Sequence, residues 1–154
     1  DGSGIPPDFF ADVHIRRAFA ACFDYDTYIT DVEMGEALQR NGPIIQPMTG
    51  FDPEDPPMPV FDMAKCEEEF KLADVDKDGI PAGEDEDDVW STGFYMMLAY
   101  NSGNDQRRVA AELLKANIEA VNENFRIDVL VDLPADVDRV RRGRKPARNR
   151  SVQL

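Results

Sequence analysis

The chain has little of what most enzymes need. Its 154 residues contain one histidine, His14, and two cysteines. No glycine-rich loop of the phosphate-cradling kind is present, and no nucleophile is paired with a general base at a readable spacing. These shortages argue against an enzyme. His14 also lies off the apolar stripe of its expected helix, so we expect it to face solvent; zinc sites usually need several His or Cys ligands.

Long apolar runs are also missing. No stretch is long enough to span a bilayer, and no signal peptide is recognisable. The first residue is Asp1 instead of methionine, which favours a processed, secreted chain, although a cytoplasmic location stays open. Cys22 and Cys66 can form one disulfide in an oxidising compartment. Because both fall on apolar helical stripes, two buried thiols are the preferred expectation.

Positive charge is scarce outside the C-terminal end. Residues 139–150 hold seven basic groups, whereas residues 1–138 hold ten against all 31 acidic groups, a net charge of −21. Such a body repels nucleic acid and attracts cations. Nucleic acid is therefore not an expected partner, and residues 141–154 are expected to form a flexible basic tail.

The clearest motif of the chain covers residues 74–85, with the sequence Asp74-Val75-Asp76-Lys77-Asp78-Gly79-Ile80-Pro81-Ala82-Gly83-Glu84-Asp85. Carboxylates alternate at positions 1, 3 and 5, a glycine at position 6 permits a turn with positive φ, and an acid closes the window. Apolar residues at helical spacing flank the loop over 61–73 and 86–100. The segment resembles an EF-hand, which is a helix–calcium loop–helix unit.

The resemblance implies a calcium site with six candidate ligands. Side-chain oxygens would come from three aspartates, one carbonyl from the residue at position 7, and the last ligand from either acid at the end: Asp74, Asp76, Asp78, Ile80, and Asp85 or Glu84. Two departures from the EF-hand pattern imply weak calcium binding, with a dissociation constant of about 10⁻⁵ to 10⁻³ M. Asp85 is one methylene shorter than the usual glutamate, and Pro81 lacks the backbone N–H that normally pairs two loops. An acidic surface turn that binds only water is the alternative.

Two further segments resemble EF-hands without a working site. Residues 23–38, at the end of an expected helix over 8–23, keep the second half of the pattern, with Tyr28-Ile29-Thr30 as a short strand. Loss of the ion is the preferred expectation, and residual binding through Asp24, Asp26 and Glu33 is the alternative. Residues 122–133 follow an expected helix over 105–121, and Ile127-Asp128-Val129 alternates as a strand does. Ligand positions of this third loop hold Arg126 and Leu133, which exclude a cation.

These units predict an all-α fold of EF-hand type, with short β pairing between loops. The expected organisation is a flexible leader over 1–7, an EF-hand-like domain over 8–140 with a proline-rich insert over 41–60, and the basic tail over 141–154. The expected helix over 86–100 carries more large apolar side chains than one stripe needs. We expect it in the core, and a groove for a partner helix is the alternative.

We expect one of three functions, the first two from the EF-hand resemblance and the third from Asp1 and the strongly acidic body. The first is a calcium-binding protein with one working site, acting as a buffer, a sensor or a holder of structural calcium. The second is a light-chain-like scaffold whose vestigial EF-hands bind a partner protein or helix. The third is a secreted acidic protein that binds calcium mineral or matrix. Ca²⁺ is the expected cofactor.

Overall fold

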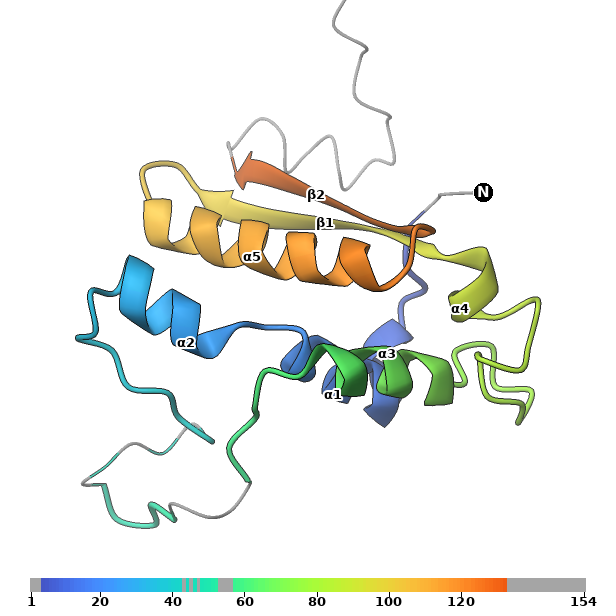
Figure 1. The fold of residues 1–154 in the computed structure, drawn as a ribbon, viewed down its shortest axis with the longest axis horizontal. Coiled ribbons are helices and arrows are strands. Elements are labelled where there is room, and N and C mark those ends of the chain that lie inside the picture. The colour runs from blue at the N-terminus through green and yellow to red at the C-terminus, as the bar shows by residue number, and fades with distance from the viewer. Residues whose placement is uncertain (1–3, 43, 45, 47, 53–56, 133–154) are drawn as a thin grey trace, which may run out of the picture.

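The computed structural model describes residues 4–42, 44, 46, 48–52 and 57–132 (Figure 1). In chain order its elements are the 3-10 helix η1 (Phe9–Ala11), α1 (Val13–Ala21), α2 (Tyr25–Thr27), the π-helical turn η2 (Tyr28–Val32), α3 (Met63–Leu72), α4 (Val89–Thr92), β1 (Phe94–Asn101), α5 (Asp105–Val121) and β2 (Phe125–Asp132). Because β1 and β2 form a parallel sheet, the prediction of an all-α fold is wrong. The chain has a mixed α/β architecture.

The sheet and α5 form one βαβ unit. Phe94 stands opposite Phe125 and Asn101 opposite Asp132, so the two strands pair over their full length. Parallel strands need a long crossover connection, usually a helix, and α5 supplies it. Figure 1 shows α5 lying along one face of the sheet. In this view, α1 and α3 lie beyond α5, on the same side of the sheet.

Of the helix expected over 86–100, only residues 89–92 are helical, and the rest of the prediction is wrong. α4 ends at Thr92, because Gly93 takes a φ of 73° and a ψ of −175°, which no helix can continue. From Phe94 onward, alternate side chains face the core, and Phe94 and Met96 are buried while Met97 is exposed. The surplus of apolar residues therefore belongs to a strand and not to a helix with two buried sides.

Other expected elements are confirmed. α3 lies within the helix expected over 61–73, α5 has the bounds expected over 105–121, and β2 contains the strand expected at 127–129. The first expected helix is divided, because Asp12 caps α1 by accepting hydrogen bonds from the backbone N–H groups of His14 and Ile15. The strand expected at 28–30 is wrong, since these residues lie in η2.

Phenylalanine rings from five elements form the centre of the core. The ring centroids of Phe94 and Phe125 lie 4.6 Å apart, and those of Phe70 and Phe125 lie 4.7 Å apart. Phe9 lies 5.2 Å from Phe94, and Phe19 lies 5.8 Å from Phe70. This cluster packs η1, α1 and α3 against the first residues of both strands.

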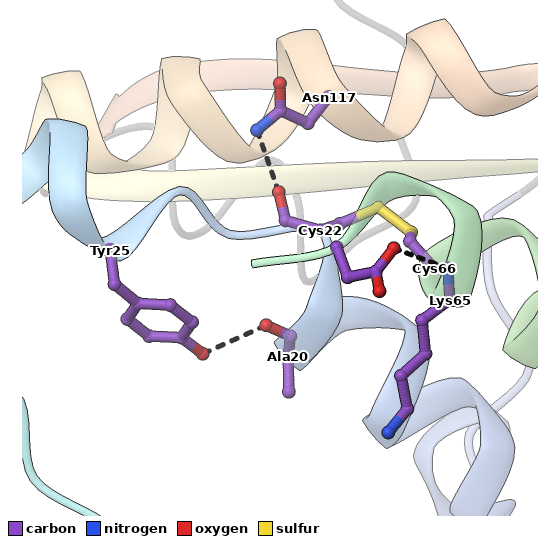
Figure 2. The surroundings of a disulfide bond; sticks show 7 residues. Ala20, Cys22, Tyr25, Lys65, Cys66 and Asn117 are labelled. Atoms are coloured by element: carbon purple, nitrogen blue, oxygen red, sulfur yellow. Dashed lines mark hydrogen bonds between the residues drawn. A yellow bond between two sulfur atoms is a disulfide. The ribbon is translucent and has the colours of Figure 1, made fainter. Parts of the chain in front are cut away.

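A disulfide joins the end of α1 to α3 (Figure 2). Cys22 and Cys66 are fully buried, and their Cα atoms lie 5.3 Å apart. The expectation of burial is confirmed, but that of free thiols is wrong. The Asn117 side chain of α5 donates a 2.8 Å hydrogen bond to the Cys22 carbonyl, so the same point also holds α5.

The expected domain limits stay predictions. Described residues between 41 and 60 include no helix or strand, in agreement with the proline-rich insert. Residues 1–3 of the leader and the basic tail over 141–154 lie outside the described residues. Within the described part of the chain, no helix is long and apolar enough to cross a membrane.

Candidate functional site

The loop between α3 and α4 brings the predicted aspartates together. Carboxylate oxygens of Asp74, Asp76 and Asp78 all lie within 4.8 Å of one another. A second group, within the same limit, consists of Asp76, Asp85 and Asp88. Glu84 belongs to neither group. Sequence reasoning missed Asp88, because it lies beyond the twelve-residue window that the motif defines.

Backbone hydrogen bonds hold this loop in its shape. The bonds run from three backbone N–H groups to three side-chain carboxylates: Gly79 to Asp74 at 3.1 Å, Asp78 to Asp76 at 3.2 Å, and Ile80 to Asp78 at 2.7 Å. Aspartates that accept such local bonds form turns by themselves. The alternation of acids therefore has a structural reason that needs no ion.

Asp88 closes the loop at its base. Its side chain is 2% exposed, and its two carboxylate oxygens accept hydrogen bonds from the backbone N–H groups of Val75 and Val89. Asp88 thereby joins the two ends of the loop and caps α4. Within the described residues, one carboxylate oxygen each of Asp74 and Asp85 is buried without a hydrogen-bond partner. The two carboxylate groups that share Asp76 concentrate negative charge in this loop.

The electrostatics of the loop reflect this concentration. The hydrogen bond from the Asp78 N–H lowers the pKa of Asp76, but desolvation and the neighbouring carboxylates outweigh it, so the net pKa is raised. Lys77, at φ 68°, turns outward to pair with Asp8. This ion pair lowers the pKa of Asp8, chiefly through the side-chain hydrogen bond.

His14, expected to face solvent, contacts α3 instead. Its Nδ1 lies 2.7 Å from Oε2 of Glu69, which is only 8% exposed. Buried carboxylates need a partner, and within the described residues this imidazole supplies it. Sequence reasoning missed the pair because its members lie 55 residues apart and no local pattern links them.

A second feature is a cleft of about 610 Å³ beside α1. One wall is the exposed side of α1, with Val13, Arg16 and Arg17. The other wall is the segment 57–60, and Asp62 and Lys65 line the end nearest α3. The cleft thus combines apolar and basic surface on a chain whose net charge is −14.

Together, the βαβ unit and the disulfide-linked helices define a mixed α/β module and not a set of helix–loop–helix units. The family model described as bacterial extracellular solute-binding proteins, family 5, middle part, matches residues 6–151. Because this match covers nearly the whole chain, the chain belongs to that family.

One solved structure supports the fold. NikA from Brucella suis, in a crystal structure with Fe(III)-EDTA, is 17% identical, with a TM-score of 0.54. The match covers 86% of this chain but only 26% of that one, so this chain spans about a quarter of the length of NikA. No curated protein matches the chain in sequence.

The family overturns the EF-hand assignment. An EF-hand needs a helix on each side of its loop, whereas α4 has four residues and leads into β1. The calcium-binding function, the light-chain-like scaffold, the calcium or matrix protein and the Ca²⁺ cofactor are therefore wrong. The six predicted ligand residues lie in this loop, and their role as ligands stays a prediction. An extracellular family agrees with the secreted option for the location.

Proposed function

We propose that the chain is part of a solute-binding lobe that acts outside the cytoplasm and holds a small solute or peptide without changing it chemically. The observation that carries the proposal is the family match over residues 6–151. The role is binding and not catalysis, in keeping with the scarcity of catalytic residue types.

Two structural features support this role. The buried disulfide between Cys22 and Cys66 suits an oxidising compartment, where such bonds persist. The cleft beside α1 has a size typical of small-ligand sites, about 610 Å³. In the NikA structure the bound compound is Fe(III)-EDTA, a small chelate. We therefore expect this chain, which has a similar fold, to take part in binding small charged molecules.

The test is a search for solutes that bind the natural protein. Native mass spectrometry of gently purified protein should reveal a co-purified small molecule. Thermal unfolding with panels of short peptides, organic acids and metal chelates should identify a stabilising ligand. At a free concentration of 100 times Kd, the stabilisation should be about 2.7 kcal/mol. If no panel member shifts unfolding, and no solute co-purifies, the proposal is wrong.

A further inference from the structure

The exposed side of α1 presents two arginines to the cleft. Because α1 buries Ile15 and Ala18, Arg16 and Arg17 point away from the core. One guanidinium nitrogen of Arg16 donates a 2.8 Å hydrogen bond to the carbonyl of Ala11, which fixes its position. Within the described residues, the side chain of Arg17 has no hydrogen bond or ion pair. The positive charge and the N–H donors of the Arg17 guanidinium therefore face the cleft without a partner among the described residues.

Lys65 adds a third basic group from α3. Its backbone N–H donates a 3.0 Å hydrogen bond to Asp62, so the Asp62 carboxylate is engaged as the N-cap of α3. Figure 2 shows the Lys65 side chain extending away from the disulfide. In the part of the chain that the structure describes, its ammonium group has no partner. Among the described residues that line the cleft, two cations are therefore uncommitted, and the single carboxylate is engaged.

The local charge of the cleft is opposite in sign to the net charge of residues 1–138. Residues 1–138 carry a net charge of −21, whereas the described residues that line the cleft include three basic residues and one acidic residue. A large anion would meet repulsion from the acidic surface outside the cleft. A small anion can reach the basic groups and escape most of that repulsion. The charge pattern therefore selects a small anion.

The opposite wall is apolar and poor in donors. Pro57 and Pro59 have no backbone N–H, and the Pro59 carbonyl already accepts a 2.6 Å hydrogen bond from the Gln39 side chain. Met58 is 42% exposed and Val60 is 70% exposed. Covering these side chains removes apolar surface from water, which favours a ligand with a hydrocarbon part.

We propose that the cleft binds a small aliphatic carboxylate. The carboxylate lies between Arg17 and Lys65, and the aliphatic chain packs against Met58 and Val60. The inference rests on the proposed function and deepens it, because it names a ligand class for one cleft of the solute-binding lobe.

The experiment is calorimetric titration of the natural protein with hexanoate. Hexanamide keeps the chain without the charge, and inorganic phosphate keeps a charge without the chain. Hexanoate should bind saturably, and both other probes should bind at least about tenfold more weakly, since charge-assisted hydrogen bonds and apolar burial each contribute that much.

Matched variants locate the binding. Arg17→Gln and Lys65→Gln keep long polar side chains at exposed positions, and each should weaken hexanoate binding at least about tenfold. Arg108→Gln removes the same charge from α5, where Arg108 pairs with Asp105, and should change the affinity less than about twofold. Val60→Asp should abolish binding, because it places an anion on the apolar wall. Circular dichroism confirms that each variant is folded.

Three results would overturn the inference: no saturable binding of hexanoate, equal affinity for phosphate, or equal losses in Arg17→Gln and Arg108→Gln. If hexanoate fails but other solutes stabilise the protein, the cleft assignment is wrong and the proposed function stands. If no solute binds at all, both are wrong.

Discussion

Removal of the disulfide between Cys22 and Cys66 should cause the largest loss of stability of any change proposed for this chain. The bond closes a loop with a sequence separation of 44 residues. The chain-entropy relation for a loop of that length gives about 4 kcal/mol at 25 °C, because the cross-link removes conformations from the unfolded chain. For a protein of this size, that loss corresponds to a fall in Tm of about 8–16 °C.

The perturbation is the double variant Cys22→Ala/Cys66→Ala, which avoids burying two unpaired polar groups where both sulfurs are fully enclosed. Urea unfolding followed by circular dichroism gives the free energy of unfolding with and without a reducing agent. Reduction should lower the stability of the unmodified protein by about 4 kcal/mol. The double variant should start from the lowered value and should not respond to the reductant.

Thiol titration provides an independent check. The unmodified protein should show no reactive thiol in urea before reduction and two after it. The reasoning would be refuted by a stability difference below about 1 kcal/mol between the unmodified protein and the variant. Two thiols that react in urea without reduction would also refute it, because the disulfide would then be absent.

Further predictions concern the strand junction and a tyrosine. Gly93→Ala should destabilise the protein more than Gly103→Ala: both have positive φ, but a Cβ at Gly93 would lie 2.2 Å from the Asn124 carbonyl oxygen, whereas none lies within 4 Å at Gly103. Strain alone should amount to about 1–2 kcal/mol at Gly103, and equal losses in urea unfolding would contradict the clash. Burial, with the 2.7 Å hydrogen bond to Asp128, raises the pKa of Tyr95 to about 12. Its stabilising effect should be complete below pH 10 and should disappear as pH rises through about 12. In ultraviolet titration, Asp128→Asn should return this pKa toward 10, and an unchanged titration would contradict the role of the carboxylate.

Elements set by local signals were predictable from the sequence. α5 has a turn before it, with Gly103 at φ 81°, and Asn104 caps it by accepting a hydrogen bond from the Arg107 N–H. Its apolar residues also recur at helical spacing over 17 residues. Because start, turn and periodicity agree, the bounds expected from the sequence match the structure.

The strand β1 was not predictable by the same means. Residues 94–101 are apolar at nearly every position, so their periodicity does not separate a helix from a buried strand. The decision comes from β2, which pairs with β1 across a connection that includes all of α5. The periodicity of residues 94–101 therefore gives no information about a partner strand that lies so far along the chain.

The acidic loop shows the same division between local and distant information. The grouping of Asp74, Asp76 and Asp78 was predictable, since short-range bonds to the backbone of the loop produce it. The EF-hand context was not, since it depends on the structure of the residues after Asp88. A four-residue helix and a strand stand where an EF-hand has its second helix. A loop motif can therefore be right in shape and wrong in family.

The disulfide closes the region from Cys22 to Cys66 into a covalent ring, and the Cα atoms of the two cysteines lie 5.3 Å apart. The wall of the cleft at 57–60 belongs to this ring, whereas the phenylalanine cluster draws on residues before and after it. Lengthening or rewriting the ring would thus reshape the cleft while the supporting framework keeps its contacts. Substitutions in the ring can therefore change the ligand preference of the cleft while the fold is retained.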